Sequence, residues 1–115
     1  MTDATAEFFA ELERRGHEPL LEKVRGTIRF DIVDGKQLRR WLVSIDRGDV
    51  TVSRRNARAD STVRIERVLS DQLVTGRANA TAEVLRGRVR VEGEIDSMIL
   101  FQRLFPGPPL AKEDR

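Results

Sequence analysis

Five short segments of this chain alternate apolar and polar residues, and no other feature constrains the fold as strongly. Ile28, Phe30 and Ile32 alternate with charged residues, and four later segments repeat the pattern. Successive side chains of a strand point to opposite faces, so each segment has one apolar face. One buried and one wet face are typical of an antiparallel sheet with helices on one side. The apolar positions predict the covered face: Ile28, Phe30, Ile32, Trp41, Val43, Ile45, Val50, Val52, Val63, Ile65, Val89 and Val91.

Helical patterns lie on both sides of these strands in the sequence. The expected helices are residues 5–15, 66–75, 79–86 and about 94–105. Gly16, Gly76 and Gly87 follow the first three, where glycine closes a helix in the left-handed conformation. Gly93 precedes the last helix and Pro106 ends it. We therefore expect an α+β fold, in which helices cover one face of a five-stranded, mostly antiparallel sheet.

The last expected helix has more apolar residues than one buried face requires. Four consecutive apolar residues, 98–101, cover most of the circumference at about 100° per residue. Such a helix packs on two sides, or it offers its surplus surface to something outside the fold. This surplus is the strongest functional indication in the residues themselves.

Length and composition limit the possible functions. The 115 residues predict one domain, 1–115, with a core at about 5–107 and a charged tail at 108–115. The chain has no cysteine, which excludes disulfides, thiol nucleophiles and thiolate metal sites. His17 is the single histidine, so neither a histidine cluster for zinc nor a nucleophile–base pair is visible. We expect no catalysis, no metal and no cofactor.

The charge pattern and the short apolar runs limit where in the cell the protein is expected and what kinds of partner it is expected to bind. The longest apolar run is four residues, against about twenty for a membrane span. No signal peptide is visible, and we expect a cytoplasmic protein. The net charge is only +2, and basic residues neighbour acidic ones, as Arg29 does Asp31 and Arg90 does Glu92. This pattern predicts a mixed, solvated polar face rather than the segregated basic face of a nucleic-acid binder.

Acidic residues and glycines follow a distinctive order in the second half of the chain. Asp60 stands before the fourth strand, Gly76 and Gly87 end the two short helices, and Gly93 with Glu94 ends the fifth strand. Through residues 59–65, 73–76 and 87–94, the chain resembles the sterol carrier protein type 2 family of lipid-binding domains, and the resemblance extends over roughly residues 5–107. The resemblance implies an apolar cavity between sheet and helices, and non-catalytic binding or transfer of a sterol, fatty acid, acyl-CoA or other lipid.

Two groups of residues are candidates for contact with such a ligand. Within the last helix, the spacing of Met98, Phe101 and Phe105 predicts one inward stripe. The candidate cavity residues are Trp41, Val43, Val84, Met98, Phe101 and Phe105. The basic loop offers Arg54, Arg55 and Arg58 to an anionic head group or to coenzyme A phosphates, unless the loop is simply solvated.

Alternative functions remain open at this stage. Trp41 also suits plain packing in the core. The outer side of the last helix, at Leu100 and Leu104, suits a homodimer contact, which would make the chain an interaction module with a filled core. A nucleic-acid accessory role is the third alternative, and steep salt dependence would distinguish it from lipid binding.

Overall fold

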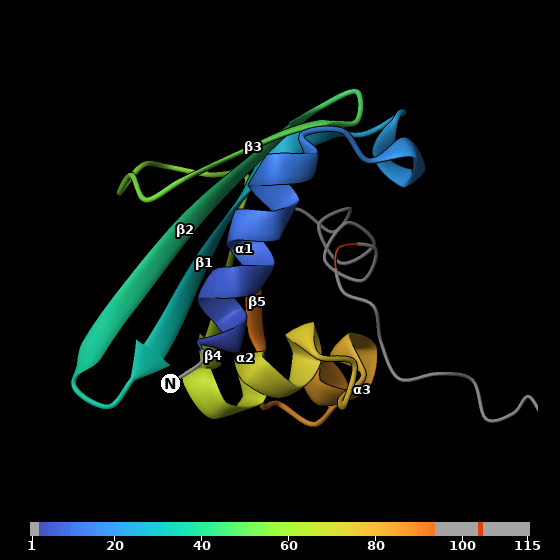
Figure 1. Ribbon diagram of the computed structural model, residues 1–115. Coiled ribbons are helices and arrows are strands. Elements are labelled where there is room, and N and C mark those ends of the chain that lie inside the picture. The colour runs from blue at the N-terminus through green and yellow to red at the C-terminus, as the bar shows by residue number, and fades with distance from the viewer. Residues whose placement is uncertain (1–2, 94–103, 105–115) are drawn as a thin grey trace, which may run out of the picture.

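The computed structural model describes residues 3–93 and residue 104 (Figure 1). Its elements, in chain order, are α1 (Ala4–Arg15), the 3-10 turn η1 (Pro19–Leu21), β1 (Arg25–Asp34), β2 (Gln37–Asp46), β3 (Asp49–Ser53), β4 (Ser61–Glu66), α2 (Arg67–Val74), α3 (Ala80–Leu85) and β5 (Arg90–Gly93). The helix expected at 94–105 lies outside the described residues except for Leu104, which is helical and buried.

The strands form one sheet of five, in the order β3-β2-β1-β4-β5. β1 with β2, β2 with β3, and β4 with β5 pair antiparallel, whereas β1 and β4 pair parallel. The expected five-stranded, mostly antiparallel sheet is thus confirmed. Phe30 of β1 is opposite Trp41 of β2 and Val63 of β4, so apolar residues of neighbouring strands share a face.

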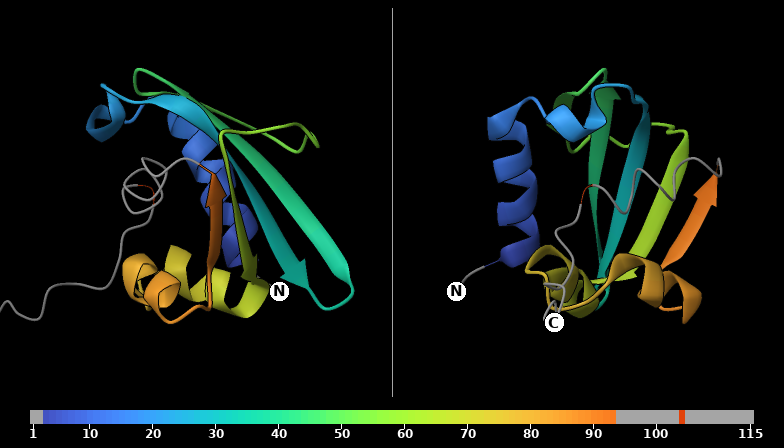
Figure 2. Two further views of the ribbon diagram at one scale, coloured as in Figure 1. Left: turned by 180° about the vertical axis from the view of Figure 1, so that it is seen from behind. Right: turned by 90° about the vertical axis from the view of Figure 1, so that its right-hand side faces the viewer.

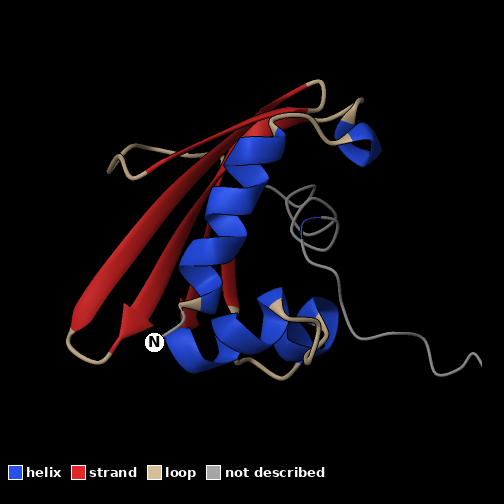
Figure 3. Cartoon of the chain, in the orientation of Figure 1, coloured by secondary structure: helices blue, strands red, loops and turns tan. Residues whose placement is uncertain are grey.

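The helices all cover this apolar face. Figures 2 and 3 show α1 lying along one side of the sheet, with α2 and α3 gathered near one end of the strands. Phe9 and Leu12 of α1 are buried in the same apolar cluster as the strand residues. Every predicted face position is buried except Val52 and Val91, which are partly buried.

The alternation in the sequence predicts a fifth strand at residues 88–92, but the strand begins two residues later. The amide of Gly87 donates to the carbonyl of Val84 at 3.0 Å, and that of Arg88 to the carbonyl of Glu83 at 3.0 Å. These amides close the end of α3, so they are not free to join the strand ladder. β5 therefore starts at Arg90, and Val89 is buried just before it.

A buried polar cluster joins the start of α1 to α2. The Thr5 hydroxyl donates to Asp71 Oδ1 at 2.7 Å and lies 2.8 Å from the Ser70 hydroxyl. Arg67 donates to the other Asp71 oxygen at 2.8 Å and to Asp34 at 3.1 Å. We call Thr5, Arg67, Ser70 and Asp71 the helix junction. It fixes the N-terminal end of α1 against the α2 end of the sheet.

A second tight contact joins β1, β4 and β5 at one corner. The Asp60 carboxylate accepts the Thr27 amide at 3.0 Å, and the Thr27 hydroxyl accepts the Asp60 amide at 2.9 Å. Gly93 has a φ of 122°, and a Cβ there would lie 2.3 Å from the Asp60 carbonyl oxygen. The acidic residue and glycine that carry the family resemblance are therefore used to hold strands together.

Candidate ligand-binding site

Trp41 lies in the covered face of the sheet and is 4% exposed. Its ring stacks on Phe9 of α1, with centroids 4.8 Å apart and planes 15° apart. The guanidinium carbons of Arg54 and Arg39 lie 4.3 and 4.9 Å from the ring centroid. Stacked rings and cations over an aromatic face are both attractive arrangements. The ring is therefore packed between secondary-structure elements, and a contact between Trp41 and ligand stays a prediction.

The other described cavity candidates belong to the same apolar cluster. Val43 is fully buried and opposite Ile28 of β1. Val84 of α3 is partly buried against the cluster. The structure thus brings Trp41, Val43 and Val84 to one side of the sheet. Met98, Phe101 and Phe105 lie outside the described residues.

Leu104 corrects one sequence-based alternative. It was grouped with Leu100 on the outer side of the last helix, but it is 7% exposed and part of the core cluster. Removing an apolar side chain from water is favourable, so Leu104 stabilises the fold when it is buried in this cluster. Leu104 does not offer a dimer contact in this structure.

Ser61 is a candidate site residue that the sequence analysis missed. It is the first residue of β4, on the same face as Val63 and Ile65, and is 2% exposed. Its hydroxyl oxygen has no hydrogen-bond partner among residues 3–93 and 104. A buried polar group without a partner costs about 1–3 kcal/mol, so native proteins rarely keep one without a ligand or water nearby. The sequence did contain a signal for this residue, because Ser61 is two positions before Val63 and therefore falls on the apolar face of its strand.

The basic loop follows β3 and is fastened at its first residue. Arg54 lies over Trp41 and donates through Nε to the carbonyl oxygen of Arg40. Arg55 and Arg58 are exposed. One predicted head-group residue, Arg54, therefore contacts one predicted cavity residue, Trp41. A role in binding a head group remains a prediction for all three arginines.

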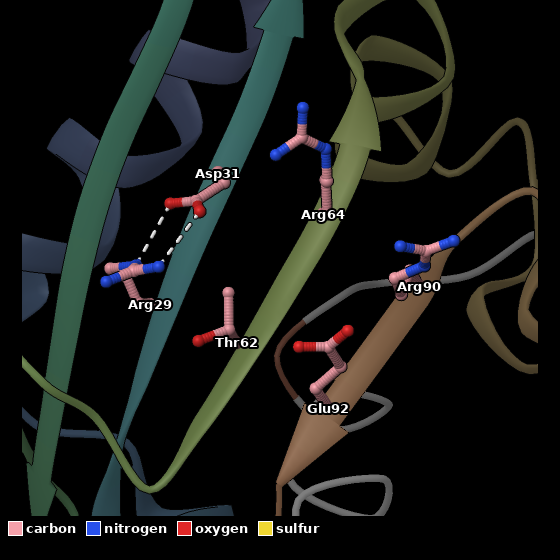
Figure 4. A pocket seen from close by; sticks show the side chains of 6 residues that line it. All are labelled: Arg29, Asp31, Thr62, Arg64, Arg90 and Glu92. Carbon is pink, nitrogen blue, oxygen red and sulfur yellow. Dashed lines mark hydrogen bonds and ion pairs between the residues drawn. The ribbon is translucent and has the colours of Figure 1, made fainter.

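The face of the sheet opposite the described helices is called the uncovered face here. It is less exposed to solvent than the charge pattern predicts. Asp31 is only 4% exposed. Arg29 donates to both of its carboxylate oxygens at 3.1 Å, and Arg40 Nε lies 3.7 Å away. The arginine side chains cover the carboxylate, because long charged side chains can lie flat along a surface. This face also has a pocket, which Figure 4 shows from close by.

His17 lies outside both faces. Its Nδ1 is 2.9 Å from Asp49 Oδ1, and its Nε2 is 3.7 Å from Glu22 Oε2. The hydrogen bond to Asp49 raises the pKa of His17, with a further contribution from Glu22. Within residues 3–93 and 104, no group of three or more histidine or carboxylate side chains is arranged to hold a metal ion. No helix in this part of the chain is long and apolar enough to cross a membrane.

Comparisons with known proteins agree with this architecture. The structure of sterol carrier protein 2 from Aedes aegypti in complex with the C16 fatty acid palmitate is 20% identical, with a TM-score of 0.68 and coverage of 90% of this chain and 94% of that chain. The sterol carrier protein domain 2 of Helicoverpa armigera is 22% identical, with a TM-score of 0.70 and coverage of 88% and 87%.

One similar structure is an enzyme. A sec-alkyl sulfatase is 18% identical with a TM-score of 0.67, over 86% of this chain but only 16% of that chain. The likeness is therefore to one part of a much larger protein. No curated protein matches the chain. Residues 9–106 match the SCP-2 sterol transfer family, and since they span most of the chain, the chain belongs to that family.

Proposed function

We propose that this chain binds one lipid molecule between the covered face of the sheet and its helices, without chemical conversion. A fatty acid, a sterol or an acyl-CoA is the class of ligand. The observation that carries the proposal is the buried hydroxyl of Ser61, which lies on the mostly apolar covered face and has no partner within the described part of the chain. The family is one of sterol transfer, and a structure of the same fold is a palmitate complex.

The free energy of burying an acyl chain supports this proposal. A C16 chain has about fourteen methylenes, and each contributes about 0.8 kcal/mol on burial, or roughly 11 kcal/mol together. Association costs at least about 4 kcal/mol. The remaining ~7 kcal/mol corresponds to a dissociation constant of about 10 µM. A binding site of this kind requires little polar recognition.

Ser61 supplies the polar contact in this proposal. A carboxylate at the end of the ligand accepts a hydrogen bond from the Ser61 hydroxyl, and a ligand hydroxyl either accepts such a bond or donates one to the Ser61 oxygen. A hydrogen bond to a charged group contributes about 1.5–3 kcal/mol, enough to select the orientation of the lipid. The proposal also accounts for a buried hydroxyl that bonds to none of the residues that the structure describes.

A non-catalytic role agrees with the chemistry of the chain. It has no thiol, and its one histidine is hydrogen-bonded to Asp49 at an exposed position. His17 belongs to the connection between α1 and β1, whereas Ser61 is buried at the start of β4.

The test compares Ser61→Ala with Ser70→Ala. Ser61→Ala should weaken palmitate binding about tenfold, because the ligand loses its polar contact. The ligand-free variant should be as stable as the parent or more so, because a buried unpaired hydroxyl is removed. Ser70→Ala breaks the helix junction instead, and should lower stability while leaving palmitate affinity unchanged.

Calorimetric titration with palmitate and native mass spectrometry measure the affinity and the number of lipids per chain. One lipid per chain and an effect confined to Ser61→Ala support the proposal. If the parent protein binds no palmitate, sterol or acyl-CoA, lipid binding itself is refuted. Equal affinities of the two variants would instead refute only the role of Ser61.

A further inference from the structure

The uncovered face of the sheet has a charged pocket on the side opposite the proposed lipid site. Its volume is about 220 Å³. Its walls come from three neighbouring strands, β1, β4 and β5. Figure 4 shows the lining side chains, which are Arg29, Asp31, Thr62, Arg64, Arg90 and Glu92.

Two of the cations that line the pocket have no ion-pair partner in the part of the chain that the structure describes. Asp31 already has two partners, Arg29 and Arg40. Within residues 3–93 and 104, Arg64 and Arg90 form no ion pair, and both side chains are exposed. The pocket thus contains two guanidinium groups whose hydrogen-bond donors are available to a ligand.

The register of the strands places these two arginines opposite one another, and Figure 4 shows their guanidinium groups directed apart over the pocket wall. Arg64 of β4 is directly opposite Arg90 of β5, and neighbouring strands lie about 4.8 Å apart. Like charges directly opposite on adjacent strands destabilise a sheet. The pair gives the fold no stability, so a role in binding an anion explains its presence better than a structural one.

A phosphate group matches this arrangement. A guanidinium binds phosphate oxygens through two parallel N–H donors, and Thr62 adds a hydroxyl to the lining of the pocket. The pocket's volume of about 220 Å³ accommodates a phosphate and its nearest waters. Arg64 and Arg90 also line an adjoining hollow of about 230 Å³, so the group attached to the phosphate has space beside it.

We propose that Arg64, Arg90 and Thr62 form a phosphate-binding site on the uncovered face of the sheet. The phosphate belongs either to a membrane lipid head group or to a soluble phosphate ester. Glu92 lies at the same pocket, where it repels a bound anion and so keeps the affinity moderate. The site is separate from the lipid site, since the two lie on opposite faces of one sheet.

Titration with inorganic phosphate at constant ionic strength tests this site, with amide NMR shifts of β4 and β5 as the readout. Arg90→Gln and Arg64→Gln should each weaken binding about tenfold, because each removes a charge-assisted contact. Glu92→Gln should strengthen it about threefold by removing repulsion. Arg77→Gln makes the same charge change at an exposed position elsewhere and should have no effect.

A vesicle experiment distinguishes the two sources of phosphate. If the phosphate is that of a lipid head group, Arg90→Gln should reduce co-sedimentation with phosphatidylglycerol vesicles more than Arg77→Gln does. If both variants sediment alike while phosphate binding differs, the natural ligand is a soluble ester. The proposal is overturned if phosphate does not bind saturably, if Arg77→Gln weakens binding as much as Arg90→Gln, or if Glu92→Gln fails to strengthen it.

Discussion

At the scale of single residues, Gly93 illustrates how a sequence signature arises from backbone geometry. A side chain at this position would meet the Asp60 carbonyl at 2.3 Å and Ser61 Cα at 2.6 Å. Neither is the end of a flexible side chain, so neither can move aside without moving the strand. The conformation, at a φ of 122°, is also one that other residues rarely adopt.

Gly93→Ala should therefore lower the free energy of unfolding by about 2–4 kcal/mol, through strain and backbone displacement. Gly35→Ala is the matched control. Gly35 also has a positive φ, but a Cβ there meets nothing within 4 Å, and the expected cost is about 1 kcal/mol. Urea denaturation of both variants measures the difference. Equal losses would show that the close approach to Asp60 is unimportant.

His17 predicts a pH dependence of stability. Its pKa is raised in the folded protein by Asp49, so the folded state favours the protonated form. The stabilisation is complete below the ordinary pKa of about 6.5 and is lost as the pH rises through the raised value. The melting temperature should accordingly fall across this range in the parent protein.

His17→Gln removes the titrating group and should flatten that part of the profile. Thermal melts of parent and variant, measured from below to above neutral pH, provide the comparison. The variant should differ most at the acid end of the range, where the parent has its protonated histidine. An identical slope in both proteins would assign the pH dependence to another group.

At the scale of elements, the helix junction determines how α1 lies on the sheet. The Thr5 hydroxyl is buried and serves both Ser70 and Asp71. Thr5→Val keeps the shape but removes these bonds and leaves Asp71 with one partner fewer. We expect a loss of about 1–3 kcal/mol in unfolding free energy.

Hydrogen exchange of α1 amides should also become faster in Thr5→Val, because α1 loses its polar attachment to α2. Thr51→Val, on an exposed position of β3, is the control and should change stability by less than about 0.5 kcal/mol. A stability loss without faster exchange in α1 would place the effect elsewhere than at the junction.

Element positions were largely predictable from sequence, but their neighbours in space were not. Alternation showed which side of each strand is covered, as Phe30 and Val63 confirm. It could not show that β1 pairs parallel with β4, because period-two patterns contain no information on strand order. The late start of β5 depends on amides that close α3, and no side-chain pattern reports them.

At the scale of the whole molecule, the family and the apolar face were predictable, whereas the polar details were not. Asp31 looked solvated in the sequence, but the register places Arg40 beside it on β2, and Arg29 folds over it from the same strand. Ser61 was missed because one polar residue in a short strand is a weak signal. The predicted role of Met98, Phe101 and Phe105 falls outside the described residues and stays a prediction.

The side chains of β4 alternate between the buried face and the charged face of the sheet. This alternation limits which sequence changes the chain can accept. Val63 and Arg64 are adjacent in sequence, yet one is buried among apolar residues and the other is exposed on the charged side. Inserting or deleting one residue in β4 would exchange the faces of all residues beyond it and drive Arg64 into the core. Substitutions can therefore alter either face independently, while changes of length must fall in connections such as residues 55–59.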